Sequence, residues 1–135
     1  MTTEIVGTAA VESAALEFVL DHERRAGRAP IDARYTASAP AALASGDRLI
    51  EVKAYSGASR GIDIWLETPQ AQAAVSRTNF HLYLVENVRQ GDPALFQLLD
   101  IHGEQLRRLM THAFERSYVT VPWPNAEYDT LSSTA

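Results

Sequence analysis

The chain has 135 residues, contains no cysteine and carries a formal net charge of -5. The lack of cysteine excludes disulfides and thiolate metal sites, and the acidic balance argues against a protein that binds nucleic acid mainly through basic side chains. No apolar run reaches the roughly 18 residues of a membrane helix, and the first residues lack a signal-peptide pattern, so we expect a cytoplasmic protein without membrane contact. We expect a single domain over 1–135, with residues 124–135 as a mobile tail.

Three segments are predicted to be helices. Over residues 9–26 the apolar positions recur at intervals of three and four, which predicts an amphipathic helix that Gly27 ends. Thr68 and Pro69 are typical of an N-cap and a first helical residue, so a short helix is expected to follow them. Residues 103–116 predict a third helix, again amphipathic.

Between these helices the sequence predicts strands. A turn at Gly46 and Asp47 indicates a hairpin, and the alternation of "GIDIWLE" is typical of a strand with one buried face. The predicted strands comprise residues 31–36, 41–45, 48–55, 61–67, 80–88 and 94–101. Strands and helices in this succession predict an α/β layered fold with a central mixed sheet flanked by helices.

The stretch "RLIEVKA" sets two charges inside an apolar strand. Residues two apart share a face of a strand, so Glu51 and Lys53 point together while Ile50 and Val52 point into a core. Burying the two charges is costly unless they are paired or bind something. Two interpretations stay open: the solvated face of an edge strand, or metal-dependent phosphodiester chemistry in which the carboxylate holds Mg²⁺ and the lysine acts on water or phosphate.

The surroundings of this pair resemble a known family over residues 9 to 100. The most specific features are "IEVKA", the group formed by Glu23, Gly27 and Arg28, and the strand-Thr-helix step over residues 66–74, with weaker support from "LYLVENV". Together they resemble the domain found at the C-terminus of the plant protein NO VEIN and in many prokaryotic defence and restriction-associated proteins. That domain is similar to the PD-(D/E)XK nuclease superfamily.

The resemblance implies a restriction-endonuclease-like fold and a Mg²⁺-dependent endonuclease, with Mn²⁺ as a substitute ion. Its implied substrate is DNA in preference to RNA, in antiviral defence or restriction, with a homodimer or a larger defence complex as the assembly. Glu51 would be a metal ligand and Lys53 the catalytic lysine, with Glu12 as an accessory acid and Gln70 near the site. Glu23 and Arg28 are expected to form a structural pair at the exit of the first helix.

The chain departs from the family at one position. The superfamily places an aspartate on the strand before the E-x-K motif, and here "APAALAS" puts Ala42 there. Three explanations stay open: an introduced inactivating Asp-to-Ala change, a natural protein that binds without cutting, or a substitute acid. Asp32 is the better substitute ligand and Asp47 the poorer one. The alternative function is therefore a non-catalytic module on a nuclease scaffold that binds nucleic acid or a partner protein.

The four histidines form no recognised metal motif. None belongs to an H-E-x-x-H pattern, so a zinc hydrolase is not predicted. His81 falls in the expected central strand and is interpreted as a structural residue, whereas His22 and His112 are expected on helix surfaces.

Overall fold

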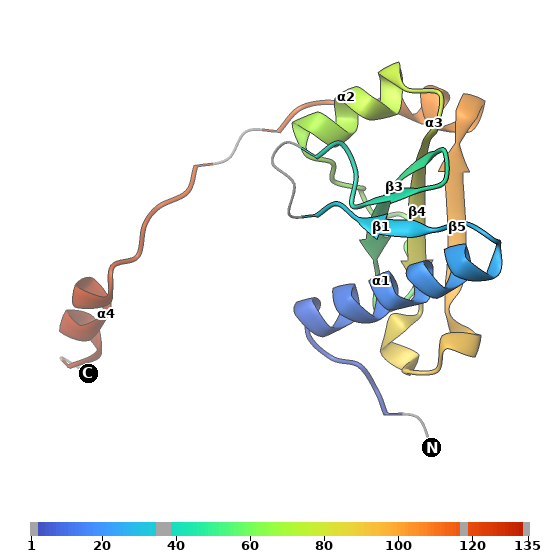
Figure 1. The fold of residues 1–135 in the computed structure, drawn as a ribbon. Coiled ribbons are helices and arrows are strands. Elements are labelled where there is room, and N and C mark those ends of the chain that lie inside the picture. Colours follow the sequence, from blue (N-terminus) through green and yellow to red (C-terminus); the bar gives the residue numbers. More distant parts are fainter. Residues whose placement is uncertain (1–2, 35–38, 117–118, 134–135) are drawn as a thin grey trace.

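A computed structural model of the chain describes residues 3–34, 39–116 and 119–133 (Figure 1). Residues 35 and 36 of the first predicted strand therefore lie outside the described residues. The helices are α1 (Thr8–Arg25), α2 (Thr68–Ser76), α3 (Gly103–Met110) and α4 (Asn125–Ser132), with short 3₁₀ turns η1 (Val88–Gln90) and η2 (Pro93–Leu95). The strands are β1 (Pro30–Asp32), β2 (Leu43–Ser45), β3 (Arg48–Ala54), β4 (Phe80–Glu86) and β5 (Gln97–His102).

The five strands form one mixed sheet in the order β1-β2-β3-β4-β5. β3 and β4 run parallel, and the other neighbouring pairs are antiparallel. The parallel pair requires a crossover, which the segment from Tyr55 through α2 provides. The predicted α/β layered fold with a mixed sheet between helices is confirmed, and so is the hairpin around Gly46 and Asp47.

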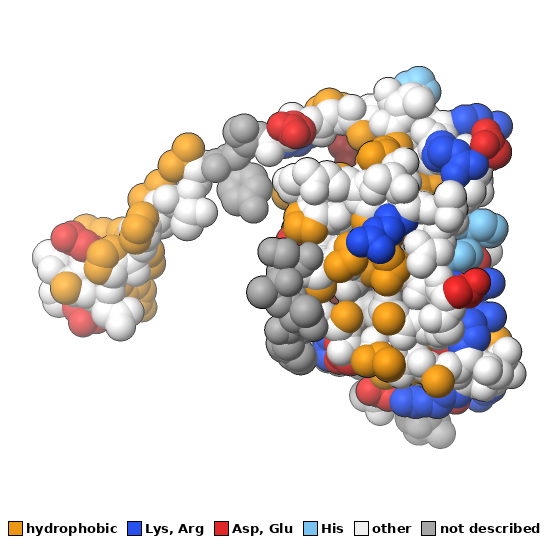
Figure 2. Space-filling view, turned by 45° about the horizontal axis from the view of Figure 1, so that its top comes forward, with side chains coloured by type: hydrophobic (Ala, Val, Ile, Leu, Met, Phe, Trp, Pro, Cys, Tyr) orange, Lys and Arg blue, Asp and Glu red, His pale blue; other side chains and the backbone are white. Residues whose placement is uncertain are grey.

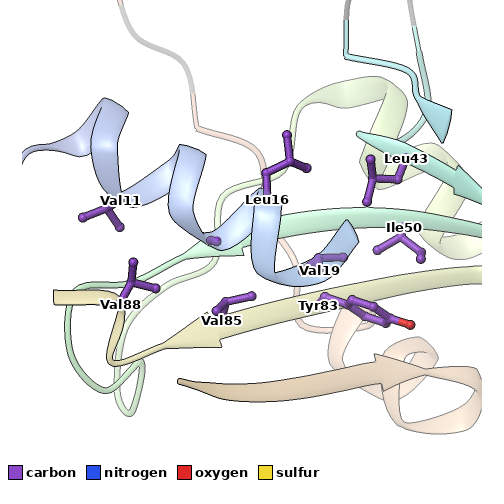
Figure 3. Close-up of a cluster of buried hydrophobic side chains, with 9 residues drawn as sticks. Val11, Leu16, Val19, Leu43, Ile50, Tyr83, Val85 and Val88 are labelled. Carbon is purple, nitrogen blue, oxygen red and sulfur yellow. The ribbon is translucent and has the colours of Figure 1, made fainter. Parts of the chain in front are cut away.

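Helices cover both faces of the sheet (Figure 1). α1 packs Val19 against Ile50 and Val85 on one face, in a cluster that also includes the ring of Tyr83 (Figure 3). Because side chains alternate along a strand, the neighbouring residues of β3 and β4 point to the opposite face. There α2 and α3 bury a second cluster that includes Leu82. The faces assigned to β3 are confirmed, since Ile50 and Val52 lie on the α1 side.

The start of α1 is held by the residues that precede it. The Ile5 amide donates to the Arg89 carbonyl at 3.0 Å, and the Arg89 guanidinium pairs with the Glu4 carboxylate. A Cβ at Gly91 would lie 1.9 Å from the Thr3 carbonyl oxygen, and Gly91 has a φ of +78°, so glycine is required there. These contacts fix the N-terminal half of α1 beside the sheet.

The strand predicted over residues 61–67 is wrong. These residues pair with no described strand and form part of the crossover between β3 and β4. Its alternation still has a physical basis, because Ile64 and Leu66 pack on the second cluster while Asp63 and Trp65 are exposed. The alternation of apolar and polar residues therefore reflects the burial of two side chains here and not the pairing of a strand.

Several predicted elements are shorter than expected. β2 begins at Leu43 and not at residue 41, and β4 ends at Glu86 and not at residue 88. α3 ends at Met110 although residues 103–116 were predicted to be helical. Leu106 and Met110 pack on the second cluster, whereas Phe114 is exposed, and short helices depend on such packing. The strand predicted over residues 94–101 begins at Gln97, because the residues before it form the turn η2.

The segment predicted as a mobile tail, residues 124–135, contains α4. This helix lies clear of the layered body at the end of an extended segment (Figure 1). Hydrophobic side chains are exposed along the extended segment and the helix (Figure 2). Among the described residues, no helix combines the length and the apolar character needed to cross a bilayer.

The C-terminal end of α1 is tied to the sheet by a buried carboxylate. Glu23 is fully buried and accepts hydrogen bonds from Arg28 Nε at 2.5 Å and Nη2 at 2.9 Å. The Tyr83 hydroxyl donates to it at 3.0 Å. Burial alone would raise the pKa of Glu23, but these hydrogen bonds and the Arg28 charge outweigh it and lower the pKa to about 2. The predicted structural pair of Glu23 and Arg28 is confirmed.

Replacing Glu23→Gln should lower the free energy of unfolding at pH 7 by roughly 3–5 kcal/mol, because it leaves the Arg28 charge without its buried partner. The folded pKa of Glu23 lies below its unfolded value, so its contribution is present above about pH 4.5 and is lost as the pH falls towards 2. Urea unfolding between pH 7 and pH 3 would therefore show a steeper acid loss for the wild type than for Glu23→Gln.

Asp21→Asn is the matched control. It removes the exposed pair between Asp21 and Arg25, whose atoms are 2.7 Å apart, and should change the free energy of unfolding by less than about 0.5 kcal/mol. Equal losses in Glu23→Gln and Asp21→Asn would contradict a structural role for the buried carboxylate.

Candidate functional site

The E-x-K pair lies where one edge of β3 is left open. Among the described residues, β2 pairs only with Arg48–Ile50 of β3, whereas β4 pairs along the strand as far as Ala54. From Glu51 onwards, β3 therefore pairs with a described strand on one side only. The short length of β2 creates this opening.

A cavity of about 600 Å³ lies at this opening. Four residues singled out from the sequence line it: Glu51 and Lys53 from β3, Glu12 from α1 and Gln70 from α2. Ala42, at the position where the family has aspartate, lines the same cavity. The fold thus brings together residues that lie up to 58 positions apart in the chain.

Glu51 and Lys53 are in direct contact. Lys53 Nζ lies 3.3 Å from Glu51 Oε2, and Glu51 is only 8% exposed whereas the lysine side chain is 27% exposed. Burial raises the pKa of Glu51, although the Lys53 charge, its hydrogen bond and the amide of Ala42 act in the opposite direction. The pair is therefore not a solvated strand face, and the ionised carboxylate is incompletely stabilised by its surroundings.

Gln70 presents a polar atom without a partner. Its Nε2 donates to the Ala39 carbonyl at 3.4 Å, while its buried Oε1 has no hydrogen-bond partner among the described residues. An unsatisfied buried acceptor is costly unless another group meets it. Gln70 lines the cavity, but this oxygen has no exposed surface, so the side chain would have to turn before the oxygen could meet a ligand there.

Asp32 is not among the described residues that line the cavity, although its partner Arg34 is. The Asp32 carboxylate accepts hydrogen bonds from Arg34 Nη2 at 2.8 Å and from Arg34 Nε at 3.0 Å. These hydrogen bonds lower the pKa of Asp32. The structure does not bring Asp32 together with Glu51, so we leave it out of the proposed site.

The cavity has acidic residues that the sequence alone did not single out. Asp63 and Glu67, from the crossover before α2, contribute two further carboxylates to its lining. Burial is the main cause that raises the pKa of Glu51, and repulsion from Glu67 adds to it in the same direction. The only available signal was the pair of acids in "GIDIWLE", and the strand predicted there gave no reason to place them at this cavity.

A second group of side chains that could bind a metal lies between β4 and β5, whereas Glu51 lies on β3, at the other edge of β4. His81 of β4 meets Asp100 and His102 of β5, and one donor atom from each residue lies within 4.8 Å of the other two. This group could hold a metal ion. Sequence reasoning missed it because only the register of β4 and β5 brings these residues together.

Comparisons of the chain with protein-family models, with curated proteins and with solved structures give no match. The resemblance to the NO VEIN C-terminal domain and to PD-(D/E)XK nucleases therefore stays a prediction, which rests on the motifs and on the arrangement of the cavity.

Replacing Glu51→Gln should leave the free energy of unfolding at pH 7, without divalent cations, within about 1 kcal/mol of the wild type or higher. Glutamine removes a charge that burial disfavours, and it can still accept from the Ala42 amide. Because the folded pKa of Glu51 is raised, the cost of its charge is present at pH 7 and is relieved as the pH falls towards 4.5.

Urea unfolding at pH 7 and pH 4.5 measures this effect. The free energy of unfolding of the wild type should rise relative to that of Glu51→Gln when the pH is lowered. Glu23→Gln is the control, since that glutamate has the opposite pKa shift. A loss of roughly 3 kcal/mol or more in Glu51→Gln at pH 7 would show that Glu51 is a structural residue.

Proposed function

We propose that this chain is a Mg²⁺-dependent endonuclease domain whose cutting is impaired by Ala42. One observation carries the proposal: Glu51 and Lys53 lie side by side at 3.3 Å in a cavity that Glu12, Gln70 and Ala42 also line. A buried carboxylate with a raised pKa beside an amine, facing a cavity, is typical of functional sites.

The donor atoms suit Mg²⁺, or Mn²⁺ in its place. Carboxylate and amide oxygens are the ligands that Mg²⁺ prefers, and the cavity offers carboxylates from Glu51 and Glu12. The Oε1 of Gln70, which has no partner among the described residues, would join them once its side chain turned. Glu51 would be the main ligand, and Glu12 an accessory acid. When bound, Mg²⁺ polarises a phosphoryl oxygen and lowers the pKa of a bound water.

Lys53 would act on the phosphate. Its ammonium group is held next to Glu51 and is partly exposed, so it can reach a group that enters the cavity. An ammonium group placed where negative charge develops on a phosphoryl oxygen stabilises the transition state. Glu51 fixes the position of this amine, because the two side chains share one face of β3.

Ala42 explains why we expect weak metal binding and little cleavage. The Ala42 backbone lowers the pKa of Glu51, and the residue lines the same cavity, so an aspartate at position 42 would add a carboxylate beside Glu51. Mg²⁺ demands near-octahedral oxygen coordination, and the loss of one carboxylate weakens such a site.

DNA is the substrate we propose, in preference to RNA, in a defence or restriction context, as the family resemblance implies. A net charge of -5 disfavours phosphate binding by the protein surface alone, so a bound cation would be needed to offset the acidic cavity. A homodimer or a larger defence complex would bring two such sites to the two strands of a duplex.

A non-catalytic interaction module is the second candidate, and two observations favour it. Alanine occupies the position where the second acid is expected. Lys53 already neutralises part of the Glu51 charge without a metal ion. Such a module would bind nucleic acid or a partner protein through the same cavity.

Ala42→Asp should restore a cation site and nicking activity. We expect calorimetry with Mg²⁺ or Mn²⁺ to show tighter binding to this variant than to the wild type, and we expect the variant to nick supercoiled plasmid DNA. Adding Lys53→Ala to Ala42→Asp should reduce the nicking rate on the order of a hundredfold, because it removes the amine that stabilises developing charge.

Ala113→Asp is the matched control, since it adds the same charge at an exposed position outside the cavity lining. It should leave both cation binding and nicking at the wild-type level. A folded Ala42→Asp variant that neither binds the cations nor nicks DNA would rule out the nuclease and leave the interaction module.

A further inference from the structure

We propose that His81, Asp100 and His102 form a second metal site, which takes a divalent transition ion of the Zn²⁺ type. His81 lies on β4, and the other two residues lie on β5. None of the three lines the cavity that contains Glu51. The proposal is therefore independent of the endonuclease function.

Strand register places the three side chains on one face. In the antiparallel pair of β4 and β5, His81 lies opposite His102, and Tyr83 lies opposite Asp100. Directly opposed residues share a face, and so do residues two apart on one strand. The two imidazole rings are stacked, with centroids 4.7 Å apart and planes inclined by 25°.

The donor atoms converge on one carboxylate oxygen. His81 Nδ1 lies 2.9 Å from Asp100 Oδ1, and His102 Nδ1 lies 3.2 Å from the same oxygen. A metal about 2.1 Å from each ligand places adjacent ligand atoms about 3.0 Å apart in octahedral coordination and about 3.4 Å apart in tetrahedral coordination. Both nitrogen-to-oxygen separations are close to those edges, and the donor atoms of the two histidines lie within 4.8 Å of each other, so rotation of the side chains would let all three meet one ion.

The ligand types select the ion. Two imidazole nitrogens with one carboxylate oxygen suit Zn²⁺, Co²⁺ or Ni²⁺, whereas Mg²⁺ prefers oxygen ligands throughout. The chain has no cysteine, so a Zn²⁺ site in it has to be built from histidine and carboxylate groups. The two proposed sites of the protein therefore differ in the cation that each binds.

The surroundings hold the carboxylate in place and leave room for solvent. Arg48 Nη1 lies 3.5 Å from Asp100 Oδ2 and donates to the Tyr83 hydroxyl at 2.7 Å, so it engages the oxygen that the histidines do not contact. Partners of this kind orient metal ligands. The positive charge of Arg48 opposes a cation, and we therefore expect moderate affinity. His81 is 12% exposed and His102 55%, so the site is open on the β5 side.

A bound ion would link the edge strand β5 to the central strand β4. His102 is also the residue directly before α3, so the same ion would fix the start of that helix. An ion that binds the folded protein and not the unfolded chain raises the free energy of unfolding. We infer a site that stabilises this side of the domain in response to transition-metal supply.

Titration of the full chain with Zn²⁺ by calorimetry, and with Co²⁺ by visible absorption, tests the proposal. The wild type should bind a single ion per chain, and Zn²⁺ should raise its melting temperature. His102→Gln should weaken binding roughly tenfold or more and abolish the rise in melting temperature, because it removes an exposed ligand without disturbing the core. His112→Gln is the matched control, an exposed histidine just after α3, and should bind as the wild type does.

Glu51→Gln separates this proposal from the endonuclease, since it should leave Zn²⁺ binding unchanged. Two results would overturn the second site: a wild type that binds neither ion, or equal Zn²⁺ affinity in the wild type and in His102→Gln.

Discussion

The burial of an ionisable carboxylate beside a cavity is the constraint on which the functional account rests. Glu51 sits on β3, largely shielded from water, and among the described residues its ionised form is favoured by Lys53 and by the Ala42 backbone. These partners do not offset the destabilising effect of burial on the ionised carboxylate, since the pKa of Glu51 is raised. A buried charge that is incompletely stabilised lowers the stability of the folded protein. Such destabilising groups are found mainly at functional sites.

The other buried glutamates, Glu23 on α1 and Glu86 on β4, show how a structural carboxylate is stabilised in the same fold. Glu23 is met by Arg28 and Tyr83, and its pKa falls to about 2. Glu86, at the end of β4, accepts the Ser59 amide at 2.5 Å and the Ser59 hydroxyl at 2.8 Å. That contact fixes the start of the crossover, which then returns to line the cavity. Glu23 and Glu86 thus hold the elements that surround Glu51. The Glu51 carboxylate itself is left for a ligand.

Patterns between neighbouring residues predicted much of this arrangement. The features that they did not predict depend on pairing between segments far apart in the sequence. The period of two in β3 assigned Glu51 and Lys53 to one face correctly, since alternation depends only on neighbouring residues. The same alternation over residues 61–67 misled, because burial of two side chains in a loop gives the same pattern as a strand. The contact of His81 with His102 depends on the register of two strands, which no local pattern encodes.

The pKa of the Glu51 carboxyl, followed through its side-chain carbon by NMR titration, tests the central claim most directly. We expect a value above 4.5 in the absence of divalent cations, because burial outweighs the two partners, and a lower value in millimolar Mg²⁺, because a bound cation favours the ionised form. A value at or below 4.5 that Mg²⁺ does not change would contradict the account, since Glu51 would then be satisfied by the protein itself.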